Sequence, residues 1–324
     1  MKSPIKSDLS YDLKIVSQIL EPLFYYDIFS YPLTIREIYE FSCHKTIKGT
    51  PINEIEAILD ELVQKGYLYE MDQFYALTNA PQWVEVRKEN NKRALKYLSR
   101  AHKMTRLMTC FPYVRAVFVS GSLSKNVMPL DGDIDYFIVT KPQRLWVTRT
   151  FLILFKKVFL FNSKKHFCVN YFVDEDLLEI EEKNRFTATE VATVLPIYGT
   201  QIYKDFWAAN QWLDNYYPNV EPRSLEQMLP EKQAWIQFVL EKILNTRLGD
   251  WLDAFFMKRT LNRWNMKFEG MAEEDFKIAL KSRRNVSKHH PRLFQQKVIK
   301  AFTKRVKAFE EKHQVQLDIK ESSL

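Results

Sequence analysis

Apolar side chains recur at three- and four-residue intervals from Ile55 to Val63, which predicts a helix with one buried face. Pro51 is typical of a helix start and Gly66 of a helix end. Two further segments with helical patterning, Leu13–Ile28 and Thr34–Cys43, come before it. The first part of the chain therefore predicts three helices.

Two β-rich runs follow these helices, Tyr67–Met71 and Phe74–Thr78, with the turn-forming pair Asp72-Gln73 between them. Three helices followed by a β-hairpin resemble a winged helix-turn-helix domain, which we expect over residues 1–81. Such domains often bind DNA, but the third helix has one lysine against four acids and would repel phosphates. These acids are Glu54, Glu56, Asp60 and Glu61. Duplex DNA is thus an unfavoured partner, and a packing or protein-contact role is favoured.

Residues 82–110 are predicted to form one long basic helix that connects the head to the rest of the chain. Four cations lie at helical spacing along one stripe of it: Lys92, Lys96, Arg100 and Lys103. An ordinary solvated face explains this stripe, and a stripe that faces a bound anion is the alternative.

After Pro112 the pattern changes to short apolar strands that alternate with helices. Strands are predicted at Val114–Ser120, Asp135–Thr140 and His166–Val173, with a helix at Leu145–Phe161 between the last two. From about residue 187 onward the chain is predicted to be almost entirely helical.

One helix of this last part, near residues 236–244, has a single apolar stripe. Its members are Ile236, Val239, Leu240, Ile243 and Leu244. The sequence as a whole therefore predicts an α+β fold, with a mixed sheet over residues 111–215 and a helical C-terminal domain over residues 216–324.

Composition limits the class of protein. The chain has 324 residues, 46% of them hydrophobic and 27% charged, so it can bury a substantial core and is not disordered. Three cysteines far apart in the sequence predict neither a disulfide framework nor a zinc site. The polar N-terminus and the absence of a long apolar run predict a cytoplasmic protein without a membrane partner.

The net charge of +8 is spread unevenly along the chain. It is −5 over residues 1–81, +6 over 82–110, zero over 111–220 and +7 over 221–324. In the basic tail, one helical stripe consists of Lys297, Lys300, Lys304 and Lys307. A solvated helix face accounts for this stripe, and attraction of a polyanionic acceptor such as RNA is the functional alternative.

The residues between the first two strands of the sheet indicate chemistry. Gly121-Ser122 ends a buried strand, and ten residues later Asp133-Ile134-Asp135 opens the next strand. Because strand side chains alternate between faces, Asp133 and Asp135 point the same way and would repel each other without a cation. Two carboxylates suit Mg²⁺, and a glycine–serine turn at a strand end suits a phosphate.

A Gly-Ser pair, a spacer of this size and an Asp-x-Asp strand resemble the signature of the polymerase-β-type nucleotidyltransferase superfamily. The resemblance covers about residues 111–215. It implies transfer of an NMP from a nucleoside triphosphate (NTP) to an acceptor that is a small molecule, a protein or RNA, with release of pyrophosphate. It also implies that Asp133 and Asp135 hold Mg²⁺ or Mn²⁺, while Gly121 and Ser122 position the phosphates.

The superfamily usually supplies a third carboxylate from a neighbouring strand, and here that strand has Asn170 at its centre. Asn170 can ligate a metal but is a poor base, so Asp174 or Glu190 is expected to take the place of the missing acid. Without such an acid, the alternative is a nucleotide-sensing regulator with weakened catalysis.

Further polar residues near the two strands are candidates for binding the triphosphate. Ser124 and Lys125 follow the Gly-Ser turn, and Arg144 and Arg149 follow the second strand. Residues of these types at such positions are more often surface or capping residues, which is the alternative for each of them.

Overall fold

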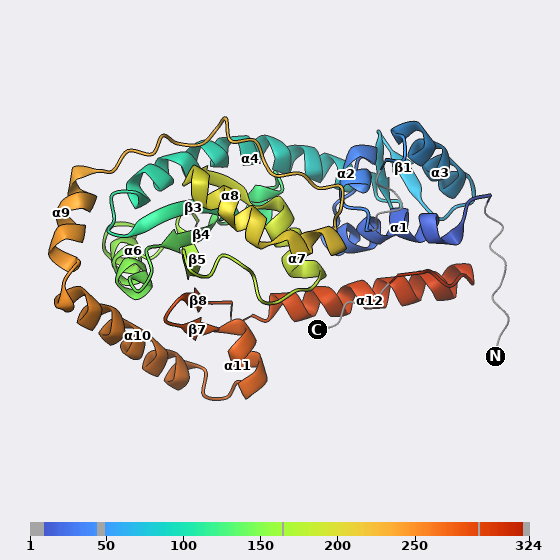
Figure 1. Ribbon diagram of the computed structural model, residues 1–324. Coiled ribbons are helices and arrows are strands. Elements are labelled where there is room, and N and C mark those ends of the chain that lie inside the picture. The colour runs from blue at the N-terminus through green and yellow to red at the C-terminus, as the bar shows by residue number, and fades with distance from the viewer. Residues whose placement is uncertain (1–9, 44–48, 164, 291, 320–324) are drawn as a thin grey trace.

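The computed structural model describes residues 10–43, 49–163, 165–290 and 292–319 (Figure 1). The head contains α1 (Leu13–Asp27), α2 (Ile35–Glu40) and α3 (Ile52–Gln64), followed by the antiparallel strands β1 (Tyr69–Met71) and β2 (Phe74–Ala76). This order confirms the three predicted helices and the hairpin.

Asp72 and Gln73 form the hairpin turn, and both have positive φ, at 52° and 66°. Two central residues with positive φ define the tight turn type that matches the twist of a two-stranded ribbon. The pairing of Met71 with Phe74 across this turn confirms the predicted turn position.

The predicted connecting helix is present as α4 (Pro81–Met108), which runs along the top of the molecule in Figure 1. Its stripe of four cations is exposed to solvent. Below α4 in Figure 1, the described part of the chain forms a six-stranded mixed sheet with the strand order β6-β3-β4-β5-β8-β7.

The sheet strands are antiparallel except for the parallel pair β4 and β5. Their bounds are β3 Val114–Ser120, β4 Asp135–Thr140, β5 Cys168–Asp174, β6 Leu195–Tyr198, β7 Ser282–Arg283 and β8 Val286–Lys288. The three strands predicted between residues 114 and 174 are therefore confirmed, with the third displaced by one or two residues at its ends.

Helices cover both faces of the sheet. The remaining helices are α5 (Gly121–Ser124), α6 (Leu145–Phe159), α7 (Arg185–Thr193), α8 (Thr200–Ala209), α9 (Trp235–Leu244), α10 (Arg247–Lys267), α11 (Glu273–Ala279) and α12 (Phe294–His313), with a 3₁₀ turn at Gln211–Asn215. On β3, Val117 and Val119 pack toward α4 and α6, while Ala116 and Phe118 pack toward α7 and α8. This alternation is the two-residue period of a strand buried on both faces.

The prediction of an almost entirely helical region after residue 187 is wrong for two strand segments and for residues 216–234, which contain no helix. Residues 195–198 form β6 at the edge of the sheet, and residues 282–288 form a hairpin that pairs with β5. β6 has only four residues, and the hairpin strands have two and three, so neither is long enough to produce a clear alternating pattern in the sequence.

The head and the sheet share one apolar core. A single cluster of buried residues includes Leu20 and Phe24 of α1, Phe118 of β3 and Phe302 of α12. The long helix α12 lies along α1 and α7 and so connects the two parts (Figure 1). At this junction the buried Arg185 of α7 forms an ion pair with the buried Glu21 of α1.

All three cysteines, Cys43, Cys110 and Cys168, are free thiols in the structure. Over the described residues, no helix has the length and apolarity that crossing a bilayer requires.

Candidate functional site

The turn between β3 and β4 brings the glycine–serine pair to the acidic pair. Ser120, the last residue of β3, pairs with Asp135, the first residue of β4. Gly121 follows with φ +67°, and a Cβ built on it would lie 2.7 Å from Oδ2 of Asp135. Both the positive φ and this close approach require glycine. The residue type at position 121 is thus explained by the position of the Asp135 carboxylate.

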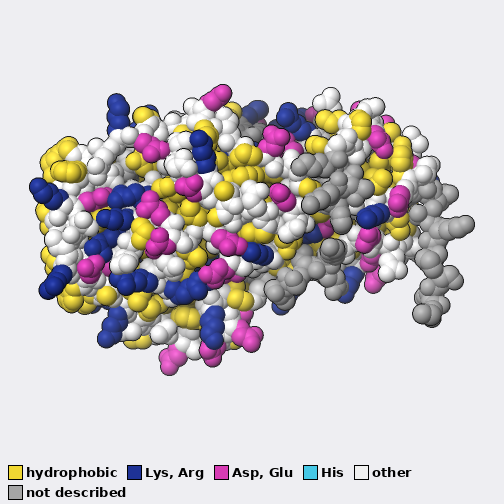
Figure 2. All heavy atoms as spheres, in the orientation of Figure 1, with side chains coloured by type: hydrophobic (Ala, Val, Ile, Leu, Met, Phe, Trp, Pro, Cys, Tyr) yellow, Lys and Arg dark blue, Asp and Glu magenta, His cyan; other side chains and the backbone are white. Residues whose placement is uncertain are grey.

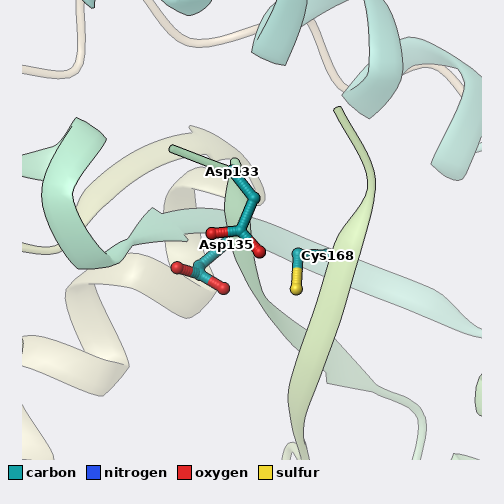
Figure 3. Close-up of side chains that lie close together, drawn as sticks. All are labelled: Asp133, Asp135 and Cys168. Atoms are coloured by element: carbon teal, nitrogen blue, oxygen red, sulfur yellow. The ribbon is translucent and has the colours of Figure 1, made fainter. Parts of the chain in front are cut away.

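Asp133 and Asp135 face a third side chain, Cys168 at the start of β5. Parallel pairing of β4 with β5 sets Asp135 opposite Cys168. The ligand atoms of these three residues lie within 4.8 Å of one another. Figure 3 shows the three side chains close together at the start of the two strands. In the part of the chain that the structure describes, this is the one group of three or more residues placed to share a metal ion.

The environment of this group favours an added positive charge. Burial, and after it the negative charge of Asp133, raises the pKa of Asp135 to about 7. Burial and the two neighbouring carboxylates also raise the pKa of the Cys168 thiol well above its ordinary value. A cation between the two carboxylates would cancel the part of the pKa shift of Asp135 that comes from the negative charge of Asp133.

The donor set fits Mg²⁺ through its oxygens. Mg²⁺ commonly takes one or two protein carboxylates and fills the rest of its shell with water and substrate phosphates. A protonated thiol is a soft group and a poor ligand for this hard ion. Asp133 and Asp135 are therefore the ligands that this group offers to Mg²⁺.

Cys168 and Asn170 occupy the part of β5 where the resemblance leads one to expect a third acid. The β4–β5 register shifts between the Tyr136 and Phe137 pairs, so Asn170 is the extra residue of a bulge. Its Nδ2 lies 3.4 Å from Oδ1 of Asp135 and 2.8 Å from Sγ of Cys168. The amide thus faces the acidic pair, as the sequence predicted, while the cysteine beside it was missed.

Glu190 of α7 lies at the glycine turn. Its Oε2 accepts a hydrogen bond from the backbone N–H of Gly121 at 3.1 Å, and its Oε1 lies 2.7 Å from Nζ of Lys125. Lys125 also donates to the carbonyl oxygen of Gly121 at 3.0 Å. The predicted residues Glu190, Gly121 and Lys125 therefore come together, although the glutamate contacts the turn and is not part of the metal-ligand group.

The serines of the turn have different surroundings. Ser124 is buried, and its hydroxyl donates to the carbonyl oxygen of Gly121 at 2.9 Å. It therefore stabilises the turn from within. Ser122 is partly exposed beside Gly121, on the short helix α5.

Three predicted site residues lie at the other end of the sheet, which corrects their assignment. Asp174 pairs with Thr140, five residues along β4 from Asp135, a separation of about 17 Å. Arg144 forms an ion pair with Asp250 at 2.5 Å. Arg149 is buried and lies over the ring of Trp264 at 4.9 Å. Asp174 is the last residue of β5 and the two arginines follow the C-terminal end of β4, whereas the acidic pair is at the N-terminal end of β4.

The ten-residue spacer before the acidic pair is fixed by α4. Asn91 donates to the carbonyl oxygen of Asn126 at 2.8 Å, and Arg93 donates to that of Met128 at 2.8 Å. The basic connecting helix α4 therefore has a structural role: its side chains hold the loop that precedes Asp133.

The C-terminal hairpin also reaches the site. After β8, the backbone N–H of His289 donates to the carbonyl oxygen of Asn170 at 2.9 Å. A segment more than 100 residues further along the chain therefore borders the bulge, which no local sequence signal could have indicated.

Comparisons with protein families, with curated proteins and with solved structures find no match to this chain.

Proposed function

We propose that this protein is a Mg²⁺-dependent nucleotidyltransferase that transfers an NMP from an NTP to an acceptor and releases pyrophosphate. The observation that carries the proposal is the convergence of Asp133 and Asp135 beside the Gly121 turn. Two carboxylates and a nearby backbone N–H with a lysine are the parts that binding a metal-bound triphosphate requires.

Each residue has a definite part in this proposal. The acceptor hydroxyl attacks the α-phosphorus and gives its proton to solvent water, while the bond from that phosphorus to the bridging oxygen breaks and pyrophosphate leaves. Mg²⁺ held by Asp133 and Asp135 would neutralise charge on the phosphates during this step. Gly121 N–H and Lys125 would contact the β- and γ-phosphates in place of Glu190, and Ser122 would add a hydroxyl at the same turn.

The second candidate function is nucleotide sensing without turnover. It is supported by Cys168 and Asn170, which stand where a third carboxylate would otherwise face the acidic pair. Neither side chain is an efficient base for an acceptor hydroxyl while the thiol stays protonated. In this case the head, with its acidic third helix, would pass the nucleotide signal to a protein partner.

Pyrophosphate release from each of the four NTPs, with Mg²⁺ or Mn²⁺ and with or without RNA as acceptor, tests the proposal. We expect Asp133→Asn to reduce the rate by about 100-fold or more, because half of the metal-ligating charge is lost. Asp131→Asn is the matched control, since Asp131 is exposed in the same loop and lies outside the ligand group.

The outcomes separate the two functions. Turnover that is lost in Asp133→Asn and kept in Asp131→Asn supports the transferase. Saturable NTP binding without pyrophosphate release supports the sensor. A wild-type protein that neither binds nor cleaves any NTP contradicts both.

A further inference from the structure

The helix α9 presents its apolar side chains to solvent. The stripe at residues 236–244 predicts a buried face, but in the structure its member Ile243 is 57% exposed, and the adjacent Trp235 is 74% exposed. The opposite, inner side of α9 is fixed by polar groups. Gln237 donates to the carbonyl oxygen of Val114, and Glu241 forms an ion pair with Arg115 at 2.9 Å. Most of the apolar stripe is therefore left without a packing partner among the residues that the structure describes.

The first half of α10 continues this exposed apolar surface. Trp251 is 59% exposed, its ring stacks on that of Phe255 with centroids 5.3 Å apart, and Leu248 is also exposed. The inner sides of the two helices meet in one cluster, where Leu244 of α9 packs with Leu252 of α10. Since both helices pack inward on the same cluster, their outer sides are adjacent. We call this outer surface the α9–α10 face.

Figure 2 shows yellow apolar and dark blue cationic side chains together along the left edge, where Figure 1 has α9 and the start of α10. The large exposed apolar side chains of the α9–α10 face are Trp235, Ile236, Phe238, Val239, Ile243, Leu248, Trp251 and Phe255. A contiguous apolar surface of this kind indicates an interaction site.

Cations predominate among the solvent-exposed charges of these two helices, with Asp250 as the one exposed acid among their residues. All six cations of α9 and α10 are exposed, and none has an ion-pair partner among the described residues. They are Lys242, Arg247, Lys258, Arg259, Arg263 and Lys267. The three acids are bound by the protein itself: Glu241 by Arg115, Asp250 by Arg144, and Asp253 by the backbone N–H groups of Trp146 and Val147.

We propose that the α9–α10 face binds the surface of an anionic lipid bilayer. Tryptophan and phenylalanine at the headgroup level, aliphatic side chains beneath them and a rim of lysine and arginine are the composition of helices that lie in a membrane interface. This contact needs no spanning helix, and it is independent of the proposed nucleotidyltransferase function.

Two other occupants fit the face less well. A second copy joined through the same face would bring its six cations against these six, and like charges facing each other oppose association. RNA would satisfy the cations and stack on the aromatic rings, but it would leave the aliphatic side chains of Ile236, Val239 and Ile243 without a suitable partner.

Co-sedimentation with vesicles tests the proposal on the full chain. We expect binding to phosphatidylcholine vesicles that contain about one third phosphatidylglycerol, and at least about tenfold weaker binding to pure phosphatidylcholine. The double variant Trp235→Ser/Ile243→Ser should lose about tenfold or more in binding to the anionic vesicles. Val86→Ser/Leu95→Ser on α4 is the control, because it removes two exposed apolar side chains from another surface.

The charges are tested in the same way. Lys258→Glu/Arg259→Glu should weaken binding to anionic vesicles at least about tenfold, whereas Lys96→Glu/Lys103→Glu on α4 should change it less than about threefold. All of these side chains are exposed, so circular dichroism and the Tm should match wild type.

The proposal is overturned if the wild-type protein binds neither kind of vesicle. If analytical ultracentrifugation then shows a dimer for wild type and a monomer for Trp235→Ser/Ile243→Ser, the face joins two copies of the chain. If the variant instead loses binding to single-stranded RNA, the face is a nucleic-acid site.

Discussion

At the scale of single residues, Gly121 is where backbone conformation and the acidic pair meet. The backbone at this position has a positive φ, which residues with a side chain rarely adopt. A Cβ atom here would also lie 2.7 Å from Oδ2 of Asp135. We expect Gly121→Ala to destabilise the protein by about 1–2 kcal/mol and to weaken NTP binding about tenfold or more, since Asp135 must move. Urea unfolding and calorimetry measure these two effects.

Gly270→Ala is the control for that substitution. Gly270 has no atom within 4 Å of its built Cβ, so this variant should keep the stability and the NTP affinity of wild type. Equal behaviour of the two alanine variants would contradict the role given to Gly121.

Glu190 holds a negative charge at the turn where the proposed function requires phosphates. An incoming triphosphate must displace this carboxylate from Gly121 and Lys125. We therefore expect Glu190→Gln to bind an uncleavable NTP analogue about fivefold more tightly, the effect of removing a competing charge worth about 1 kcal/mol.

The comparison variant for Glu190 is Glu179→Gln, whose exposed carboxylate forms an ion pair with Lys183. Calorimetry should give it the affinity of wild type. Weaker binding by Glu190→Gln would show that the glutamate supports the nucleotide site and does not compete with its ligand.

At the scale of elements, α10 fixes the start of α6 through one carboxylate. Oδ1 of Asp253 accepts the backbone N–H groups of Trp146 and Val147, at 2.8 and 3.0 Å. Burial is the main cause that raises the pKa of Asp253 from 3.8 to about 6. The native protein therefore holds this proton more tightly than the unfolded chain does.

A raised carboxyl pKa lowers stability as the pH rises through the interval between the two values. Relative to Asp253→Asn, we expect the free energy of unfolding of wild type to fall by about 2 kcal/mol between pH 4 and pH 6, with a limiting slope of about 1.4 kcal/mol per pH unit. Urea unfolding of both proteins at several pH values measures this difference. The difference in the free energy of unfolding between the two proteins should be constant above pH 7. A difference that is constant across the whole pH range would contradict the buried state of Asp253.

The elements predicted most accurately from the sequence are those whose pattern depends only on residues close together in the chain. The helix at residues 52–64, the turn at Asp72-Gln73 and the two strands on either side of the Gly121 turn follow from local spacing. Cys168 was missed because its place in the group depends on the parallel register of β4 and β5. The same register puts Asp174 beyond reach of the acidic pair, and only the packing of α7 brings Glu190 to the turn.

At the scale of the whole molecule, the head and the sheet are predicted to unfold together. Their shared core is crossed by the buried ion pair between Glu21 and Arg185. We expect Glu21→Ala to lower the free energy of unfolding by about 3–5 kcal/mol, because it removes the carboxylate that neutralises the buried Arg185 guanidinium. Denaturant unfolding followed by fluorescence should still give one transition.

Glu40→Ala is the matched control, since Glu40 pairs with Arg36 on the exposed surface of the head. Its loss should cost less than about 1 kcal/mol. Two separate transitions in wild type, or equal losses in the two variants, would contradict a single cooperative unit.

The central claim is that Asp133, Asp135 and the Gly121 turn together bind a metal-bound NTP. Isothermal titration of the full chain with an uncleavable NTP analogue, in the presence and absence of Mg²⁺, tests it most directly. We predict saturable binding at one site in wild type and Asp131→Asn, dependent on Mg²⁺ and abolished in Asp133→Asn. Binding that is equal in Asp133→Asn and wild type, or no binding by wild type at all, would contradict the account.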